Sequence, residues 1–435
     1  MCDDLGYGDL SCMGAEDFVT PNLDALAADG MRFDDLYCAS PVCSPSRAAL
    51  LTGRYPAHAG VRAILAGHRK ATGLQPSIPT VSSTLHDAGY HTACVGKWHL
   101  GVTESCRPTQ HGFDSFYGFL SGCVDYYSHT FYHGIVDRTM NPVHDLWEDD
   151  TEVFDNGKYL TDIITDRSIE VLRHARASEQ PFFLYTAYNA PHYPMHAPNE
   201  YMDRFSHLPR DRQLMAAMIS AMDDGIGRIV AELKRNRQYD NTIIYFQSDN
   251  GPSRESRNWT DGRLDPYYGG SAGLFRGHKF SLFEGGIRIP AILRCPGLPT
   301  GVVSHEPVCA IDIFPTVCAL TGVEVPAGVD GCNLLPWLQG NAAFPTRDLF
   351  WEMEKQTAVR RGNYKLILHP FEDEDRDEVC DVFLADLSAD PSERHNLAEE
   401  KPALTASLTE AAQSWRAGIE EIWEEKFAQN YRQTT

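Results

Sequence analysis

A cysteine at the start of a predicted helix is the residue of this chain best suited to chemistry. Cys43 is followed by Ser44, Pro45, Ser46 and Arg47 and then by an apolar run, and a proline at this spacing is typical of a helix N-terminus. Backbone N–H groups and the helix dipole favour an anion there, and the forked guanidinium of Arg47 suits an oxyanion. For an isolated cysteine and proline, a buried structural thiol is the competing interpretation. The full run instead indicates a nucleophile beside an anion site.

Two pairs of adjacent oxygen donors lie far apart in the sequence. Asp3 and Asp4 form one pair, and Asp249 and Asn250 form the other. A single pair of this kind is most often a turn or a helix cap. Because both pairs are expected at strand ends in one sheet, we interpret them as ligands of a hard cation, Ca²⁺ or Mg²⁺.

Lysine and histidine side chains occur in three further polar segments. Lys97 and His99 are two residues apart, so in an extended loop they can face the same way. His192 lies between two prolines, and Lys279 lies in a segment that runs into Gly285 and Gly286. Alone, each would be a solvated cation or a satisfied loop histidine. Lys97 and His99 follow a predicted buried strand, which favours a role in a pocket.

The elements that must position these residues alternate between helix and strand. Apolar periodicity and flanking proline or glycine predict helices and buried strands in the order helix 21–30, helix 79–88, strand 91–95, helix 159–177, strand 182–187, helix 211–235 and strand 242–246. This alternation predicts an α/β fold with a large, mainly parallel sheet sandwiched by helices. Ligands bind such sheets at the carboxyl ends of the strands, so motifs two hundred residues apart can share one pocket.

The alternation stops after about residue 340. Strand signals at 357–360 and 364–368, an acidic run at 372–378 and a helix at 402–427 predict a smaller antiparallel sheet with one helix. We therefore expect a catalytic domain over residues 1–340 and a C-terminal subdomain over residues 341–435. The acidic run is expected to be a solvated loop, and residues 252–278 a long functional loop.

Taken together, these motifs resemble the signatures of the type I sulfatases, which share the alkaline-phosphatase-like fold. The resemblance covers residues 3–300 and extends to the segment from Leu384 to Ala398. Within that family, the sequence most resembles the arylsulfatases and the N-acetylgalactosamine-4-sulfatases. It implies that Cys43 is oxidised to formylglycine by a formylglycine-generating enzyme. It also implies that this residue, with Asp3, Asp4, Asp249 and Asn250, binds a divalent metal, expected to be Ca²⁺ with Mg²⁺ as the alternative.

The same resemblance implies a role for each remaining polar residue. Arg47 and Lys97 would stabilise the hydrated aldehyde, and Asp249 or the metal would help to deprotonate it. His99 would take the proton of the second hydroxyl, so that sulfate leaves and the aldehyde is regenerated. Lys279 and His192 would hold the sulfate oxygens and assist departure of the alcohol.

Three functions remain open on the sequence. The leading one is hydrolysis of a sulfate monoester to an alcohol and inorganic sulfate. A phosphonate or phosphate ester hydrolase of the same superfamily is the second, and a non-catalytic sulfoglycan-binding protein is the third. Segments 111–118 and 125–129 look like the N-acetylgalactosamine-4-sulfatase branch, and their aromatic residues suit either stacking on a sugar or packing beneath the loop. We expect a sulfated carbohydrate or aryl sulfate as substrate.

Composition excludes several other classes. The net charge of −22 makes sequence-independent binding of nucleic acid improbable, and no stretch approaches the roughly 20 apolar residues of a membrane span. The twelve cysteines form no C-x-x-C pair, so we expect reduced thiols and no zinc site. Met1 and Cys2 run directly into Asp3 without a signal peptide. This predicts a cytosolic protein, or an exported one if the sequence lacks its first strand and a leader.

Overall fold

The computed structural model describes residues 1–131, 142–255, 268–371 and 380–428. Its helices are α1 Pro21–Ala28, α2 Cys43–Thr52, α3 Val81–Asp87, α4 Leu160–Ser178, α5 Asn199–Arg204, α6 Arg210–Arg235, α7 Glu284–Ile287, α8 Ile313–Thr321, α9 Leu335–Leu338 and α10 Pro402–Lys426. Its strands are β1 Met31–Phe33, β2 Leu36–Tyr37, β3 His91–Lys97, β4 Ser115–Phe119, β5 Thr130–Phe131, β6 Val143–His144, β7 Trp147–Glu148, β8 Thr151–Glu152, β9 Phe182–Ala187, β10 Ile244–Gln247, β11 Ala291–Arg294, β12 Val302–Ser304, β13 Val308–Cys309, β14 Asp348–Met353, β15 Gln356–Arg361, β16 Tyr364–Leu368 and β17 Val382–Asp386.

The central layer consists of two sheets joined by the first residues of the chain. One sheet has the order β8-β7-β4-β3-β9 and the other β10-β11-β1-β12. The Cys2 amide donates to Gln247 O at 3.0 Å, and the Asp249 amide donates to Cys2 O at 3.1 Å, which extends the second sheet. On the other side, the Tyr188 amide donates to Met1 O at 3.0 Å. Residues 1–3 therefore lie between the carboxyl ends of β9 and β10.

The predicted α/β class is confirmed, and the strand directions add detail. β3 runs parallel to both β4 and β9, and β12 runs parallel to β1. β11 is antiparallel to β10 and to β1. A parallel neighbour requires a crossover to the opposite end of the sheet. After β10 the chain instead forms part of the site at the end of the sheet where β10 finishes. It enters the sheet again from that end as β11, so β11 is antiparallel to β10.

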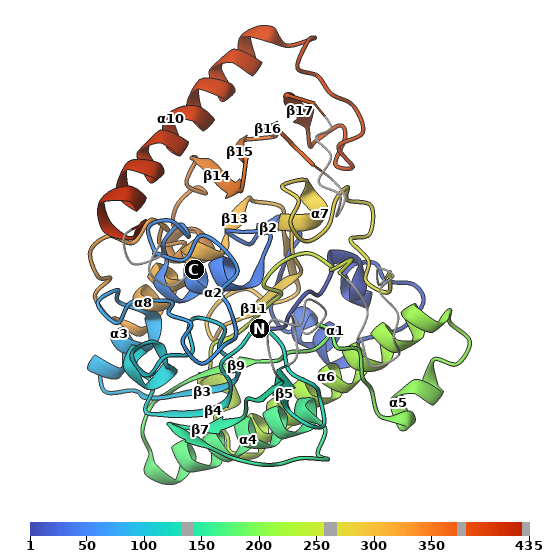
Figure 1. The fold of residues 1–435 in the computed structure, drawn as a ribbon, viewed down its shortest axis with the longest axis vertical. Helices are drawn as coiled ribbons and strands as arrows, with labels where there is room; N and C mark the ends of the chain where they lie inside the picture. Colours follow the sequence, from blue (N-terminus) through green and yellow to red (C-terminus); the bar gives the residue numbers. More distant parts are fainter. Residues whose placement is uncertain (132–141, 256–267, 372–379, 429–435) are drawn as a thin grey trace.

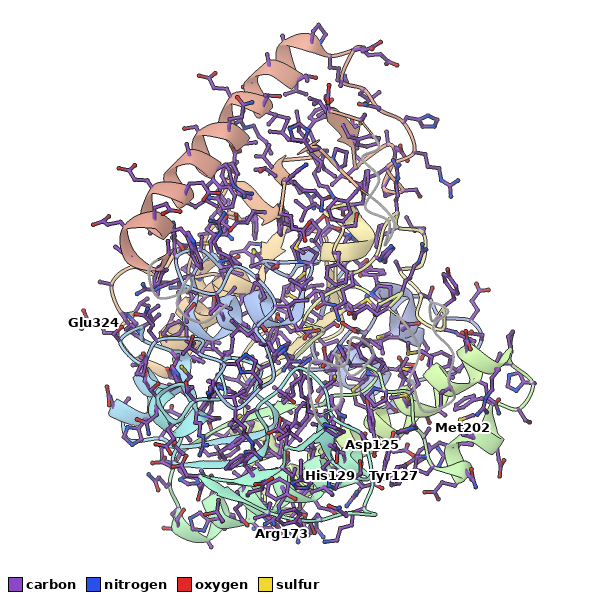
Figure 2. The ribbon with its side chains drawn as sticks, viewed as in Figure 1. Asp125, Tyr127, His129, Arg173, Met202 and Glu324 are labelled. Atoms are coloured by element: carbon purple, nitrogen blue, oxygen red, sulfur yellow. The ribbon has the colours of Figure 1, made fainter. Side chains whose placement is uncertain are left out.

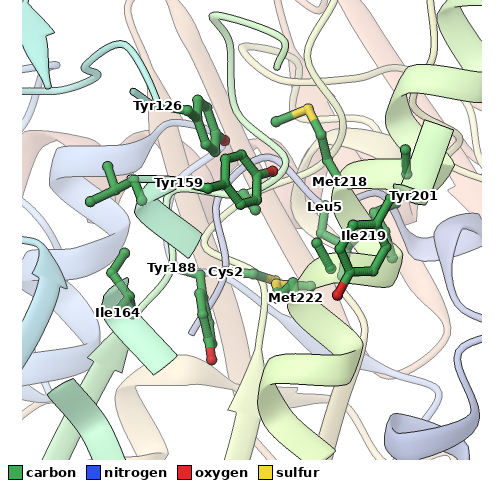
Figure 3. Close-up of a cluster of buried hydrophobic side chains, with 14 of the residues drawn as sticks. Cys2, Leu5, Tyr126, Tyr159, Ile164, Tyr188, Tyr201, Met218, Ile219 and Met222 are labelled. Carbon is green, nitrogen blue, oxygen red and sulfur yellow. The ribbon is translucent and has the colours of Figure 1, made fainter. Parts of the chain in front are cut away.

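Helices cover both faces of this layer (Figure 1). On one face α4 packs against β3, β9 and α6, and α6 also contacts α1 and α5. The apolar stripe of α4, with Ile164 fully buried, contributes to the cluster around Met218 and Tyr188 (Figure 3). On the other face α2 and α3 pack against α8, with Leu51, Leu85 and Phe314 buried between them and the sheet. The sheet is therefore buried on both sides, as the apolar strands require.

The C-terminal part forms the expected antiparallel sheet with one helix. Its strands follow the order β14-β15-β16-β17, and α10 lies across the sheet (Figure 1). Leu408 and Ala412 of α10 pack on Val359, Leu366 and Leu384. The acidic run predicted to be a loop lies outside the described residues.

Six buried charged side chains lie where this sheet meets α7 and the segment around β2, and we call them the interface cluster. Lys365 binds Glu284 at 2.7 Å and Glu393 at 2.9 Å. Arg360 binds Asp35 at 2.9 Å, and Arg288 pairs with both Asp35 and Glu284. Its members are Asp35, Glu284, Arg288, Arg360, Lys365 and Glu393. Charges buried this far stabilise a fold only when fully paired.

All twelve cysteines lie in described segments, and no disulfide joins any two of them. Among the described helices, none combines the length and apolar composition that crossing a bilayer demands.

Candidate active site

Cys43 is the first residue of α2, and its thiol is buried. The ligand atoms of Cys43, Asp3, Asp4 and His192 all lie within 4.8 Å of one another. Burial raises the pKa of the Cys43 thiol well above its usual value, although nearby Lys279 and Lys97 act to lower it. The unmodified side chain is therefore a neutral thiol rather than a reactive thiolate.

The two acidic pairs meet although more than 240 residues separate them. The Asp4 amide donates to Asp249 Oδ1 at 3.1 Å, and Asn250 Nδ2 donates to Asp4 Oδ1 at 2.7 Å. Asp4 has a φ of +60°, a left-handed conformation that Asp tolerates better than most residues. This backbone turn lets Asp3 contact Lys97 while Asp4 contacts Lys279.

The acidic residues fit a hard divalent cation. Asp3 Oδ1 and Asn250 Oδ1 are buried and have no hydrogen-bond partner among the described residues. Buried polar atoms are nearly always satisfied, so these two oxygens indicate a missing partner. Carboxylate and amide oxygens are the donors that Ca²⁺ and Mg²⁺ prefer. Asp3, Asp4, Asp249 and Asn250 could therefore hold such an ion beside Cys43.

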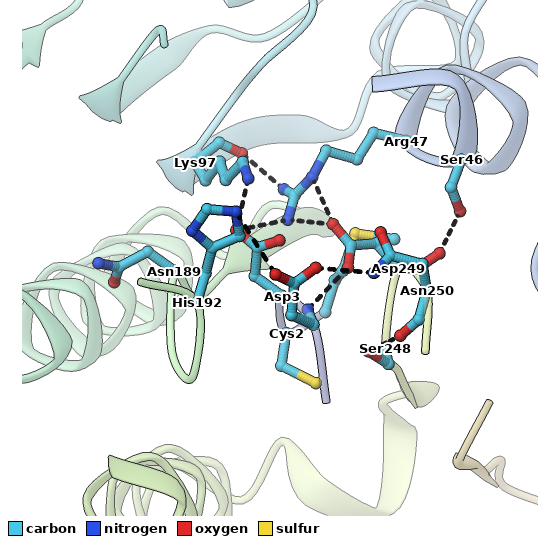
Figure 4. A network of polar contacts seen from close by, with 12 residues as sticks. Cys2, Asp3, Ser46, Arg47, Lys97, Asn189, His192, Ser248, Asp249 and Asn250 are labelled. Atoms are coloured by element: carbon cyan, nitrogen blue, oxygen red, sulfur yellow. Dashed lines mark hydrogen bonds and ion pairs between the residues drawn. The ribbon is translucent and has the colours of Figure 1, made fainter. Parts of the chain in front are cut away.

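Two buried cations hold the carboxylates in place (Figure 4). The Arg47 guanidinium donates to Asp249 Oδ2 at 2.8 and 3.0 Å and to the Lys97 carbonyl at 3.1 Å. Lys97 Nζ donates to Asp3 Oδ2 at 2.5 Å. Burial acts to lower the pKa of Lys97, but the Asp3 carboxylate outweighs it and the pKa is raised. Both side chains therefore remain charged beneath the nucleophile.

A glycine allows the ends of β3 and β9 to approach closely enough to place Lys97 in the site. Gly96 precedes Lys97 at the end of β3 and has a φ of +111°. A Cβ at this position would lie 2.0 Å from the Ala187 carbonyl oxygen at the end of β9. A side chain here would therefore push β3 and β9 apart and displace Lys97.

His99 is set up to accept a proton. Its Nε2 lies 3.0 Å from the Leu65 carbonyl oxygen, which can only accept, so Nε2 carries the hydrogen. Burial lowers the pKa of His99 well below its usual value, and Lys97 and Arg47 add to this effect. Its Nδ1 is buried and has no partner among the described side chains and backbone groups. The imidazole is therefore neutral, with a free lone pair on Nδ1.

Lys279 and His192 are the last two residues of the predicted site. Lys279 also contacts Glu255, which the sequence did not indicate. Lys279 Nζ lies 3.0 Å from Asp4 Oδ2, 3.3 Å from His192 Nε2 and 2.6 Å from Glu255 Oε2. His192 Nδ1 donates to the Tyr193 carbonyl oxygen at 2.6 Å, so its Nε2 is the acceptor. Glu255 lies in a segment predicted as a loop, where a carboxylate has no distinguishing spacing.

Of the aromatic residues of segment 125–129, Tyr126 packs beneath a loop, the second of the two roles that suited them. Tyr126 is fully buried, stacks on Tyr159 and donates to the His192 carbonyl oxygen at 2.9 Å. Asp125 caps the turn through the amide of Tyr127, and these two residues lie beside His129 (Figure 2). Tyr126 therefore supports His192 from below and is not available to stack on a sugar.

Comparison with known proteins finds sulfatases among the proteins that this chain resembles. A family model described as Sulfatase matches residues 1–323, and one described as N-sulphoglucosamine sulphohydrolase, C-terminal, matches residues 270–416. N-acetylgalactosamine-6-sulfatase of Sus scrofa is 36% identical over 379 residues, which cover 84% of this chain and 70% of the relative. Arylsulfatase A of Homo sapiens is 33% identical over 442 residues, covering 91% and 82%.

A solved structure agrees with these relatives. Ps i-CgsB, determined in complex with k-i-k-neocarrahexaose, superposes with a TM-score of 0.83 at 32% identity. The match covers 95% of this chain and 91% of that one. The similarity thus extends over nearly the whole chain.

Proposed function

The chain belongs to the sulfatase family of sulfuric ester hydrolases, and we propose that it removes sulfate from a sulfated carbohydrate with a nucleophile made from Cys43. The observation that carries this proposal is the meeting of Cys43, Asp3, Asp4 and His192 within 4.8 Å at the start of α2. The phosphonate hydrolase and the non-catalytic alternatives are not favoured, because the matched relatives are named as sulfatases.

Family membership implies a formylglycine and a divalent metal, and the residues present fit both. We propose that Cys43 is the precursor, that a formylglycine-generating enzyme converts it, and that the ion is Ca²⁺ held by Asp3, Asp4, Asp249, Asn250 and residue 43. When present, the two groups would supply a hydroxyl nucleophile and would polarise both this hydroxyl and a sulfate oxygen. The unpartnered oxygens of Asp3 and Asn250 support this assignment.

The protein's own side chains account for charge and proton movement around this centre. Arg47 and Lys97 hold Asp249 and Asp3 in position through hydrogen bonds, and they add positive charge next to the sulfate. His99 offers Nδ1 as a proton acceptor, because Leu65 fixes its hydrogen on Nε2. Lys279 lies on the other side of Asp4, where it can bind a sulfate oxygen and donate a proton to the departing alcohol, and His192 orients it by accepting a hydrogen bond at Nε2.

A carbohydrate substrate is supported by the names of similar proteins. One relative is named for N-acetylgalactosamine 6-sulfate, and one similar structure contains a neocarrahexaose. The position of the sulfate on the sugar is best decided by measurement. A panel of 4- and 6-sulfated N-acetylgalactosamines, sulfated galactans, an aryl sulfate and an aryl phosphonate should give the highest kcat/KM on one sulfated sugar. Activity on the aryl sulfate alone would contradict the carbohydrate assignment.

Mass spectrometry of the Cys43 peptide tests the nucleophile separately. Protein produced together with a formylglycine-generating enzyme should carry the aldehyde at position 43, and turnover should scale with the converted fraction. Full activity in protein with only the unmodified thiol would contradict the assignment of Cys43.

A further inference from the structure

Lys279 has no free hydrogen-bond donor for a substrate. An ammonium group has three N–H bonds, and Lys279 Nζ has three acceptors within reach: Asp4 Oδ2, His192 Nε2 and Glu255 Oε2. The contact with Glu255 is the shortest of the three, at 2.6 Å. A sulfate oxygen that binds Lys279 must therefore displace one of these partners.

Two of the three partners are fixed in place. Asp4 is buried, and its other carboxylate oxygen accepts from Asn250 at 2.7 Å. His192 is buried between the Tyr193 carbonyl oxygen and Lys279. Moving either residue would break the acidic centre or leave a buried imidazole unsatisfied, which costs free energy.

Glu255 is held far more loosely. Its side chain is 22% exposed, against 2% for both Asp4 and Lys279. Apart from Lys279, its contacts with the described residues are local: Ser253 Oγ lies 3.0 Å from Glu255 Oε2 and 3.0 Å from the Glu255 amide. Glu255 is therefore the partner of Lys279 that can move into solvent without disturbing the rest of the site.

We propose that Glu255 is a displaceable counter-ion that occupies the sulfate position on Lys279 in the free enzyme and sets the affinity for sulfate groups. This inference rests on the proposed function. A carboxylate and a sulfate both present oxygens to an ammonium group, so they compete for the same N–H bond. Glu255 leaves Lys279 when the substrate sulfate binds and returns when inorganic sulfate departs. Glu255 thus weakens the binding of both substrate and product. It also excludes anions that bind Lys279 too weakly to displace it.

The test is calorimetric titration of inorganic sulfate into the metal-loaded protein. Glu255→Gln should bind sulfate about tenfold more tightly than the wild type, because a neutral amide competes poorly for a charged donor. The KM for the sulfated substrate should fall by a similar factor. Glu306→Gln is the matched control: Glu306 is exposed and, like Glu255, its amide bonds a serine hydroxyl two residues earlier. This control should bind sulfate as the wild type does.

Unchanged or weaker sulfate binding in Glu255→Gln would overturn the proposal, since Glu255 would then only support Lys279. If that variant does not fold, Ser253→Ala provides a second test, because it removes the hydroxyl that holds Glu255 beside Lys279. It should tighten sulfate binding by about two- to threefold, and weaker binding would again overturn the proposal. Absence of turnover on every sulfate ester by the wild type would contradict the proposed function, whereas the calorimetric comparison would still decide the role of Glu255.

Discussion

The active site and the interface cluster both pair buried carboxylates with buried cations, and they differ in how the individual oxygen atoms are satisfied. Asp3, Asp4 and Asp249 meet Arg47, Lys97 and Lys279 in the site, and three carboxylates meet three cations in the interface cluster. All of these side chains are buried. Charge and burial alone therefore do not distinguish the catalytic centre from a structural ionic network.

The difference lies in the individual oxygen atoms. In the interface cluster every carboxylate oxygen has a hydrogen-bond or ion-pair partner: Glu393 Oε2 accepts from the Glu284 amide at 2.6 Å, and Glu393 Oε1, which makes no hydrogen bond, still lies 2.9 Å from Lys365 Nζ. In the site, Asp3 Oδ1 has none among the described residues. A closed network holds a fold together, whereas an incomplete one has room for an ion or a substrate. Four predictions test this contrast, in order of decreasing effect.

Cys43→Ala should abolish catalysis without loosening the fold. Turnover should fall by roughly 10⁴-fold or more, the usual result of removing a nucleophile. The thiol makes no ion pair, so the melting temperature should stay within about 3 °C of that of the wild type. Kinetics and thermal unfolding of the same preparation measure both. A large loss of stability would mean that Cys43 is primarily a structural residue.

Asp3→Asn should weaken metal binding by roughly 10³-fold, because even residues behind a ligand cost 10- to 100-fold. The amide also cannot neutralise Lys97 as the carboxylate does. Titration of the metal-free protein with Ca²⁺ measures the change. Asp24→Asn is the control, since Asp24 binds Ser11 and Thr20 well outside the site. Equal Ca²⁺ affinity in Asp3→Asn and wild type would place the ion elsewhere.

Lys365→Met should destabilise the fold and spare the chemistry. It leaves Glu284 and Glu393 without their shared cation, and an unpaired buried charge costs about 3–4 kcal/mol. Denaturant unfolding should show this loss, while kcat of the folded fraction stays unchanged. Lys355→Met, an exposed neighbour on the turn after β14, serves as the matched control. A fall in kcat without a loss of stability would reverse the roles assigned to the two clusters.

Stability should also depend on pH through the interface cluster. Burial raises the pKa of Glu393 from 4.5 to about 7, with Glu284 adding to the shift and Lys365 opposing it. Between these values the folded protein keeps a proton that the unfolded chain has released. The free energy of unfolding should therefore fall as pH rises through this window, by on the order of 2 kcal/mol.

Glu284 acts in the opposite direction. Burial acts to raise its pKa, but Lys365 and Arg288 lower it to about 2. Its contribution is present above the unfolded value of 4.5 and is lost as pH falls towards 2. Unfolding curves from pH 3 to 8 should show a maximum near the unfolded value, and Glu393→Gln should flatten the alkaline side. An identical alkaline slope in that variant would assign the effect to other groups.

Local sequence signals predicted the elements that carry the site. The strand predicted at residues 182–187 is β9, and the helix predicted to start at Cys43 is α2, because apolar runs bounded by proline, glycine or polar residues are properties of neighbouring positions. The pairing of Glu284 with Lys365 and Glu393, and of Glu255 with Lys279, could not be predicted in this way. These contacts join a helix, a strand and loops that are not neighbours in the sequence, and only tertiary packing brings them together.

The segment of residues 1–3, which lies between β9 and β10 in the structure, has a consequence for solubility. Cys2 completes the hydrogen bonding of β10, and Met1 and Asp3 bind the backbone just beyond β9. If this segment detached, both strands would present open edges, which are templates for intermolecular pairing. The same segment contains Asp3 and is followed by Asp4, so an ion bound there would also hold the two sheets together. Resistance to aggregation would then depend on metal occupancy. Removal of the metal by a chelator would expose strand edges that can pair with other molecules, and it would also stop turnover.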